Sequence, residues 1–176
     1  MALLPIIIAP DPRLKVKCDP VEKVDAGIVK LLDDMLDTMY DAPGLGLAGP
    51  QVGVQKRLLV VDTSKDVDAR DPKFLINPEI LSASGELFKY EEGCLSLPEH
   101  YAEVERPARI RVKYLDRGGA ACEMEAEDLL ATCIQHEMDH LEGILFVDHL
   151  SRLKRSVILR KLQKMKKQQM QKAVGA

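Results

Sequence analysis

The chain has 176 residues, of which 46% are hydrophobic and 30% charged, and its formal net charge is -3. This length and balance predict one globular domain, residues 1–176, with room for a substantial core. The weak net charge gives no general reason to expect DNA or an anionic membrane as a partner. No apolar run approaches the ~20 residues of a membrane-spanning helix. The apolar start at 1–8 lacks the basic region and cleavage site of a signal peptide, so we expect a cytoplasmic protein.

The four cysteines, Cys18, Cys94, Cys122 and Cys133, are scattered, with no Cys-x-x-Cys pair among them. Such spacing in a domain of this size favours free thiols over disulfides. Cys18, Cys122 and Cys133 are expected to be small buried apolar residues. Cys94 differs because it follows a glycine in a predicted loop between strands, where a thiol can reach a metal ion.

The first quarter of the chain begins with a proline-rich arm that runs to Val24. From Asp25, apolar residues at helical spacing predict an amphipathic helix of about four turns that ends before Pro43. The next segment, residues 44–51, is Gly-Leu-Gly-Leu-Ala-Gly-Pro-Gln, and its glycines permit close approach of another chain. Its apolar residues predict a partly buried, strand-like wall. The segment lacks the Lys-Ser/Thr pair of a phosphate-binding loop.

Strands are predicted along the middle of the chain. Residues 57–62 form a buried strand, residues 74–81 a second strand in which Pro78 marks an edge position or a bulge, and residues 86–91 a third. Residues 101–116 alternate in polarity, which predicts one further strand. Its cationic side chains, Arg109, Arg111 and Lys113, are expected to face solvent. A turn at 117–119 and a return strand at 121–126 complete this hairpin.

Two helices follow the strands. The first, from about Glu127 to Gly143, is apolar on nearly all sides and is therefore expected to be buried. The second, from Asp148 to about Lys172, is amphipathic. Its basic end, residues 161–172, is interpreted as a solvated helix end, with contact to ribosomal RNA as the alternative. The predicted fold class is α+β, with mixed and antiparallel strands packed around the buried helix and an amphipathic C-terminal helix.

The motif His-Glu-x-x-His occupies residues 136–140 of the buried helix. Residues four apart lie on one face of a helix, so His136 and His140 can bind one metal ion. Glu137 is too poorly aligned to be a third ligand, but it can reach a water bound on that metal. This arrangement is typical of metal-assisted hydrolysis. Asp139 is a candidate for a residue that orients the site.

A third ligand has to come from elsewhere, because a catalytic metal usually has three protein ligands and one open position. Phe146 stands where one protease pattern has its third histidine, and it cannot bind metal. The other downstream candidates are expected to face away or to lie too near the chain turn; they are Glu142, Asp148 and His149. Cys94 offers a thiolate, which is a good ligand for Zn(II) or Fe(II) and completes a Cys-His-His set.

The neighbours of Cys94 also have expected positions. The backbone N–H of Leu95 would lie beside the metal, where an oxyanion develops. Glu92 would repel the thiolate if it were a ligand itself. It is better placed behind the ligands, where its carboxylate accepts hydrogen bonds.

Three stretches together carry a resemblance to a known family: residues 44–51, Glu92-Gly93-Cys94-Leu95-Ser96, and the motif at 136–140. Their order and spacing resemble peptide deformylase, the enzyme family that removes the formyl group from N-formylmethionine on new bacterial polypeptides. The resemblance extends over nearly the whole chain and includes the Arg106-Pro107 strand entry. The polar C-terminal helix resembles that of the type familiar from Gram-negative bacteria.

The resemblance implies a metal centre and a reaction. Cys94, His136 and His140 would bind one divalent metal ion per chain, typically Fe(II), with Zn(II), Ni(II) or Co(II) able to substitute. A metal-bound water would attack the formyl carbon of an N-formylmethionyl nascent peptide and release formate. Glu137 would act as the general base and then as the general acid. A monomer is expected.

The resemblance also implies how the substrate is held. The Gln51 side-chain amide and the Leu95 N–H would stabilise the oxyanion. The segment 44–48 would pair with the peptide as an added strand. The implied substrate-binding residues are Gly44, Leu45, Gly46, Glu92, Gly93, Cys133 and Ile134.

Two positions depart from the family pattern. Gly49 stands where the family usually has Ala, which is expected to loosen the loop that positions Gln51. Tyr101 stands where some members have Arg, so contacts beyond the methionine pocket are expected to differ.

Two alternative functions stay open. A metallo-endopeptidase would use the same metal chemistry to cut internal, unformylated peptide bonds. A purely structural metal site would need a fourth ligand, for which Cys122 or Cys133 could be nominated.

Overall fold

The structure is a computed structural model that describes residues 2–175. Its α-helices are α1 (Ala26–Asp41), α2 (Asp128–Leu141) and α3 (Arg152–Val174). Its strands are β1 (Gly46–Ala48), β2 (Leu58–Val61), β3 (Lys73–Ala83), β4 (Leu87–Cys94), β5 (Leu97–Pro107), β6 (Arg109–Leu115) and β7 (Ala121–Glu127). Short 3-10 helices lie at Pro12–Lys15, Gly49–Val52, Val67–Ala69 and Phe146–His149.

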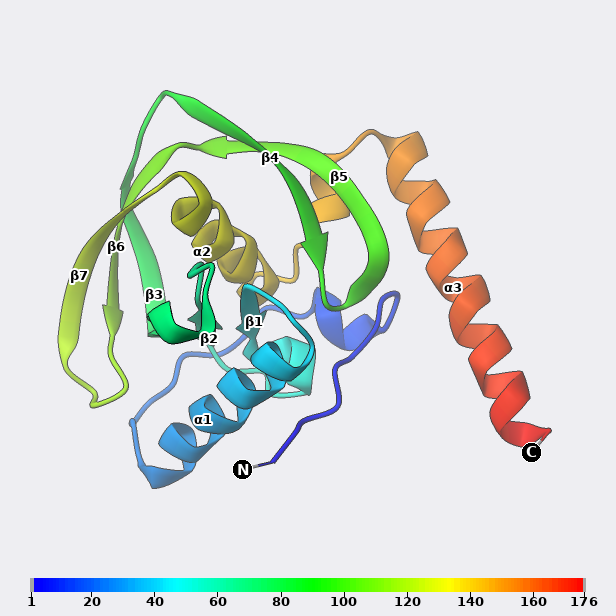
Figure 1. Ribbon diagram of the computed structural model, residues 1–176, viewed down its shortest axis with the longest axis horizontal. Coiled ribbons are helices and arrows are strands. Elements are labelled where there is room, and N and C mark those ends of the chain that lie inside the picture. Colours follow the sequence, from blue (N-terminus) through cyan, green and yellow to red (C-terminus); the bar gives the residue numbers. More distant parts are fainter. Residues whose placement is uncertain (1, 176) are drawn as a thin grey trace.

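The strands form two antiparallel sheets (Figure 1). One is five-stranded, in the order β1-β2-β3-β6-β7, and the other is the β4-β5 hairpin. A parallel contact occurs at the isolated bridge between Asp19 and Lys56. The predicted α+β class is confirmed, and within the described residues the parallel contribution is limited to that bridge.

The helices begin and end close to where the sequence predicts. The Asp25 side chain accepts a hydrogen bond from Ile28 N at 3.0 Å, which starts α1, and the helix ends before Pro43. Helix α2 is buried along most of its length, as expected from its apolar surface. Helix α3 begins at Arg152 and not at Asp148, because residues 146–149 first form a 3-10 turn.

The strand predicted over 101–116 is wrong in one respect, because it is two strands in different sheets. Strand β5 ends at Pro107 and pairs with β4, whereas β6 begins at Arg109 and pairs with β3 and β7. Proline has no N–H to continue a ladder, and Ala108 N donates instead to Glu86 O at 2.8 Å. The predicted solvent face is confirmed for Arg109, Arg111 and Lys113, which are all exposed.

Pro78 lies at a bulge. Strand β3 is in the middle of its sheet, so the edge alternative for this proline is wrong. The pairing register shifts between Ile76 and Glu79, and Asn77 between them has a left-handed φ of 51°. The Asn77 side chain supports this conformation, because it accepts from Val21 N and donates to Val21 O, each at 2.8 Å.

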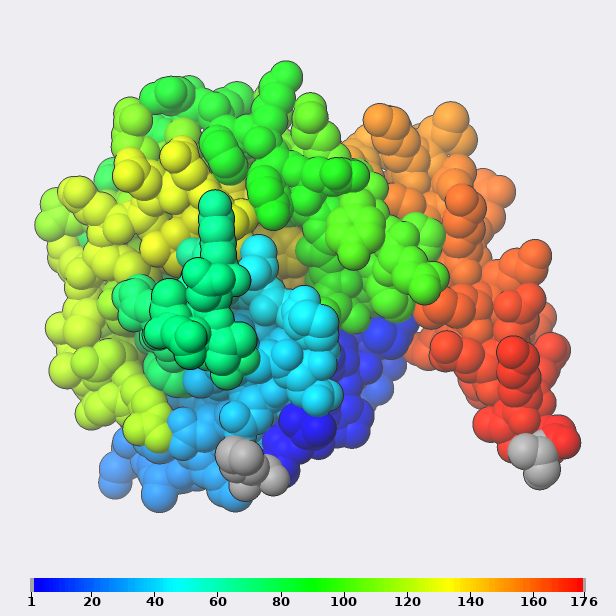
Figure 2. All heavy atoms as spheres, in the orientation of Figure 1, coloured from blue at the N-terminus to red at the C-terminus, as the bar shows by residue number. Residues whose placement is uncertain are grey.

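Helix α2 lies between the two sheets and forms the centre of the molecule. Its apolar face packs on the five-stranded sheet, for example through Ala131, Ile134 and Leu141, while the β4-β5 hairpin arches over its other side (Figure 1). Helix α3 stands at one edge of the molecule, away from α1 and the large sheet (Figure 2). None of the described helices has the length and apolar character needed to cross a membrane.

Candidate metal centre

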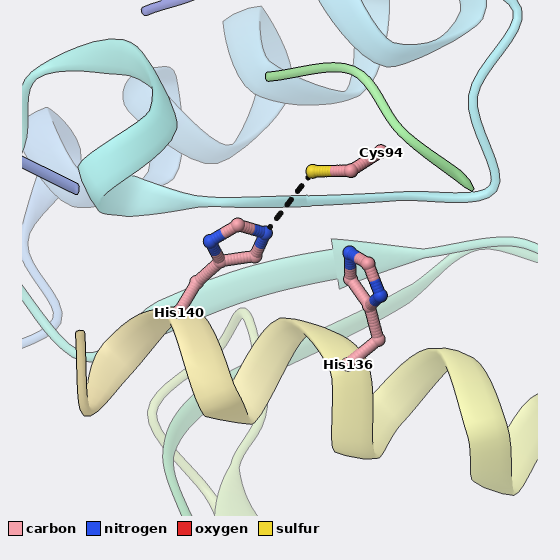
Figure 3. A group of neighbouring side chains, drawn as sticks. All are labelled: Cys94, His136 and His140. Carbon is pink, nitrogen blue, oxygen red and sulfur yellow. Dashed lines mark hydrogen bonds between the residues drawn. The ribbon is translucent and has the colours of Figure 1, made fainter. Parts of the chain in front are cut away.

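Cys94, His136 and His140 converge at one point. One ligand atom from each, the Cys94 Sγ and a ring nitrogen of each histidine, can be chosen so that all lie within 4.8 Å of one another. Both imidazoles project from one face of α2 toward the cysteine at the end of β4 (Figure 3). The distance from Cys94 Sγ to His140 Nε2 is 3.4 Å, and two ligands of one Zn-sized ion lie about 3.5 Å apart. Within residues 2–175, this is the one such group of His, Cys, Asp or Glu side chains.

Glu92 fixes the protonation of His136. Its Oε1 lies 2.8 Å from His136 Nδ1. Burial raises the pKa of Glu92, but hydrogen bonds from His136 and Arg106 outweigh burial and lower that pKa to about 2. An ionised carboxylate can only accept, so Nδ1 must donate, and Nε2 is the nitrogen that a metal ion would bind.

Arg106 holds Glu92 in turn. The guanidinium donates from Nε to Glu92 Oε2 at 2.7 Å and from Nη2 to Oε1 at 3.0 Å, while Nη1 donates to Asp139 Oδ2 at 2.9 Å. The side chains of Arg106 and Glu92 are only 6% and 3% exposed, so this ion pair is buried. Removing one partner of a buried pair costs about 3–5 kcal/mol, because the other charge is left uncompensated.

The two histidines differ in their electrostatic surroundings. Burial lowers the pKa of His136, but its hydrogen bonds to Cys94 and Glu92 outweigh this and raise that pKa well above its usual value. For His140, burial and the positive charges of His136 and Arg106 all lower the pKa, so the ring is neutral. A metal ion that binds here must displace the His136 proton. The donor set therefore fits a divalent cation.

Glu137 lies beside the three candidate metal ligands Cys94, His136 and His140, which are called the metal-ligand group below, and is not part of that group. Its Oε1 is 3.9 Å from His136 Nε2, and its buried Oε2 has no hydrogen-bond partner among the described residues. Burial raises the pKa of Glu137 to about 7. Gly46 of β1 packs directly against it, since a Cβ at that glycine would lie 2.5 Å from Glu137 Oε1. The carboxyl group is thus confined between α2 and β1, with one oxygen unpaired.

Gln51 is held beside Cys94 by both ends of its amide. Its Oε1 accepts from Ala48 N at 2.9 Å, and its Nε2 donates to Ser96 Oγ at 3.1 Å and lies 3.5 Å from Cys94 Sγ. Gln51 and Ser96 are 1% and 0% exposed. The structure therefore brings the predicted Gln51 side chain to the metal-ligand group, and Ser96 is the orienting partner that sequence reasoning missed.

A pocket of about 420 Å³ opens onto this group. Predicted site residues that line it are Gly44, Leu45, Gly46, Glu92, Gly93, Cys94, Leu95, Cys133, His136 and Glu137. The predicted contact from Ile134 is not found, because its side chain is fully buried in the core on the sheet side of α2. Residues missed by sequence reasoning include Tyr90, Leu97, His100 and Thr132.

The two departures from the family pattern have structural consequences. A Cβ at Gly49 would lie 2.8 Å from the carbonyl oxygens of Val54 and Lys56, so the backbone is closely packed at this glycine. The expected loosening of the loop stays a prediction. Tyr101 lines the pocket with 65% of its surface exposed. Its ring lies against Gly93, where a Cβ would come within 2.5 Å of Tyr101 Cε1.

The other nominated ligands lie outside the metal-ligand group. Glu142 pairs with Arg57 at 2.7 Å, and Asp148 pairs with Lys15 at 2.6 Å. Cys122 Sγ is 3.5 Å from Asp116 Oδ2 on the far hairpin. Among the described residues no fourth protein ligand joins Cys94, His136 and His140, so the arrangement is that of a site with an open position.

The geometry agrees with the resemblance, and comparison with known proteins decides the family. The model of the family described as polypeptide deformylase matches residues 3–156. The chain belongs to the polypeptide deformylase family. It is 57% identical over 167 residues to a peptide deformylase of Mesorhizobium japonicum, covering 95% of each chain. It is 54% identical over 174 residues to one of Rhizobium meliloti, covering 99% of this chain and all of the relative.

Solved structures of the family have the same fold. The crystal structure of peptide deformylase from Ehrlichia chaffeensis superposes with a TM-score of 0.91 at 42% identity, covering 96% of this chain and 99% of that one. A second structure of that enzyme, in complex with actinonin, gives a TM-score of 0.90 at 44% identity over 94% and 98% of the two chains. The protein is thus an enzyme with the deformylase fold.

Proposed function

We propose that this protein is a metal-dependent hydrolase that removes the N-formyl group from N-formylmethionyl nascent peptides and releases formate. Membership of the family and relatives named peptide deformylase support the reaction. The observation that carries the proposal is the position of Glu137. Its carboxyl group is buried at the pocket, beside the metal-ligand group, and has one unpaired oxygen. A structural metal site needs no such group.

Cys94, His136 and His140 would hold the metal ion. We propose Fe(II) as the native metal, with Zn(II), Ni(II) or Co(II) as substitutes. A bound divalent ion supplies a Lewis acid and lowers the pKa of water toward neutrality. A thiolate and two imidazoles suit the borderline-soft metals named here better than Mg(II) or Ca(II), which prefer oxygen ligands.

Glu137 is the proposed general base and acid. Burial brings the pKa of its carboxyl group to about 7, so near neutral pH it can take a proton from the attacking water and return it to the departing amine. Gly46 lies directly against this carboxyl group, and it has no side chain that would displace the carboxyl group.

The oxyanion is proposed to form next to Gln51 and Leu95. The Gln51 amide is held in place by Ala48 and Ser96, and its second N–H, which faces Cys94 Sγ at 3.5 Å, is the proposed donor. Leu95 follows the ligand Cys94 directly and lines the same pocket, which supports its N–H as the second donor.

Strand β1 and the pocket are proposed to hold the peptide. Strand β1 pairs with β2 alone among the described strands, so its other edge can accept an extended peptide. Leu45 and Cys133 line the pocket and would contact the methionine side chain. The close packing of Gly46 on Glu137 leaves little room at the reacting carbon, which favours formyl over the larger acetyl group.

The partners beyond the peptide stay predictions. We expect a monomer. The basic end of α3, residues 161–172, is mostly exposed, and none of these residues lines the pocket. A solvated helix end and an electrostatic contact with the ribosome are both compatible with this position.

Glu137→Ala tests the assigned reaction. Formate release from a formyl-Met peptide should fall at least about 100-fold, as for loss of a general base, while metal content stays that of the wild type. Near-normal turnover would refute the role of Glu137. A metallo-endopeptidase would instead cleave internal bonds of unformylated peptides, an activity that chromatography of the peptide fragments would detect and that we expect to be absent.

A further inference from the structure

The hydrogen-bond chain behind His136 continues past Glu92 to the molecular surface. Arg106 Nη1 donates to Asp139 Oδ2 at 2.9 Å, and His149 Nε2 lies 2.8 Å from the same oxygen. The chain of hydrogen bonds therefore connects, in order, His136, Glu92, Arg106, Asp139 and His149. The inner three side chains are buried, and the exposure rises only at the outer end, to 22% at Asp139 and 38% at His149.

The outer half of this hydrogen-bond chain is separate from the pocket of about 420 Å³ beside the metal ligands, which is the proposed substrate pocket. Arg106, Asp139 and His149 line a second cavity of about 350 Å³, together with Gln135 and Met138 of α2. None of these residues lines the substrate pocket, which contacts α2 through residues 132, 133, 136 and 137. The two cavities thus lie on different faces of the helix that carries the metal ligands.

We propose that His149 is a positioning residue for the metal ligand His136 and acts through Asp139, Arg106 and Glu92. This inference rests on the proposed metal centre. His149 neither lines the substrate pocket nor belongs to the group of candidate metal ligands.

His149 is the donor in its contact with Asp139. A carboxylate can only accept hydrogen bonds, so His149 Nε2 carries a hydrogen and donates it to Asp139 Oδ2. That oxygen receives two donors, one from His149 and one from Arg106. Without the His149 donor, the partly exposed Asp139 carboxylate is held by Arg106 alone and can shift toward the second cavity.

A movement of Asp139 would reach His136 because the intervening groups are stiff. The guanidinium of Arg106 is planar, so a shift of Nη1 also displaces Nε and Nη2, which hold the two oxygens of Glu92. Glu92 Oε1 in turn orients the His136 ring. Each link is a charge-assisted hydrogen bond, the stronger and more directional class.

If His149 only stabilised the fold, its loss would affect stability and not metal binding. His149 ends the 3-10 helix Phe146–His149, and its bond to Asp139 ties that segment to α2. If that were its whole effect, its loss would lower the free energy of unfolding and leave the metal-binding properties unchanged.

The test compares His149→Ala with His149→Gln, whose amide restores a donor toward Asp139. Metal affinity is measured by competition with a chelator, and ligand geometry by the visible spectrum of the Co(II)-loaded protein. We expect His149→Ala to lose about tenfold in metal affinity, the low end for groups behind a metal ligand, and to shift the Co(II) bands. The Gln variant should return to within about twofold of the wild type. The kcat for formate release should fall in the Ala variant with KM unchanged.

Two further variants make the test specific. Glu142→Gln changes a charge on the wall of the same cavity but breaks only contacts to Arg57 and Lys17, so it should bind metal as the wild type does. In an Asp139→Ala background, His149→Ala should have no additional effect on metal affinity, because the chain is already interrupted. Any one of three results would overturn the inference. These are additive losses of metal affinity from Asp139→Ala and His149→Ala, equal losses in the His149→Ala and His149→Gln variants, and an unchanged Co(II) spectrum in folded His149→Ala. Formate release by the wild type tests the proposed function separately.

Discussion

Gly46→Ala is a small substitution whose effect follows directly from the packing at the pocket. Gly46 is in β1, opposite Val61 of β2, and its backbone does not have a left-handed φ. An alanine is therefore tolerated by the strand. Its Cβ would lie 2.5 Å from Glu137 Oε1, 2.8 Å from Cγ and 2.9 Å from Cδ. The three contacts involve one side chain, and that side chain is the proposed base.

The size of the effect can be worked from these distances. Non-bonded carbon contacts are comfortable at about 3.5 Å, so the Glu137 carboxyl group must move by about 1 Å. It is 4% exposed, which limits its movement away from the pocket. A misplacement of about 1 Å in a catalytic group costs about 100-fold in rate, or about 2.7 kcal/mol in the barrier. We expect kcat to fall by that factor.

The assay is formate release from a formyl-Met peptide at equal metal occupancy. Gly46→Ala should bind metal like the wild type, because no metal ligand is among the atoms that the new Cβ approaches. Gly85→Ala is the matched control, since a Cβ there has nothing within 4 Å and Gly85 is exposed. Wild-type kcat in Gly46→Ala would contradict the argument, as would a loss of metal that accounts for the loss of rate.

Two further predictions concern buried titratable groups. Glu92→Gln removes the negative charge opposite the guanidinium of Arg106 and leaves one acceptor oxygen, for which Arg106 and His136 compete. We expect a loss of about 3–5 kcal/mol in urea unfolding and about 10–100-fold in metal affinity by chelator competition, and wild-type values for both would contradict the role of Glu92. Burial and the hydrogen bond to Asp62 raise the pKa of Tyr40 from 10.0 to about 12. Because the folded pKa lies above the unfolded value, this stabilisation is present below pH 10.0 and is lost as pH rises toward about 12. Unfolding of the wild type should therefore become easier across that window by up to about 3 kcal/mol relative to Tyr40→Phe, and parallel pH profiles for the two proteins would contradict it.

Much of the secondary structure could be predicted because its signals are local. The stripe of apolar residues and the Asp25 cap define α1, and the nearly uniform apolar surface of α2 predicts its burial. The bulge at Pro78 also follows from a local rule, since proline lacks the N–H that a ladder needs.

The division between β5 and β6 could not be predicted, for a physical reason. The inward positions continue in phase across the break, with Val104, Arg106, Ala108, Ile110 and Val112 all buried. Alternation therefore gives no signal that the chain changes sheets. Which strand each half pairs with depends on the β4-β5 hairpin arching over α2, a contact between distant parts of the chain.

The metal-ligand residues could be named from the sequence, but the groups behind them could not. The spacing of His136 and His140 and the thiol of Cys94 carry their own chemical signal. Arg106 has none, because charged residues on a strand are mostly exposed, and its burial depends on two carboxylates that are far away in the sequence. An arginine at an inward position of an alternating strand was the one available hint.

The most direct test of the account is formate release by anaerobically purified protein, with the metal content measured on the same sample. We predict one Fe(II) or other divalent ion per chain, formate from a formyl-Met peptide, and no product from the matched acetyl-Met peptide. Fully metal-loaded protein that released no formate, or that cleaved both peptides equally well, would contradict the proposed function.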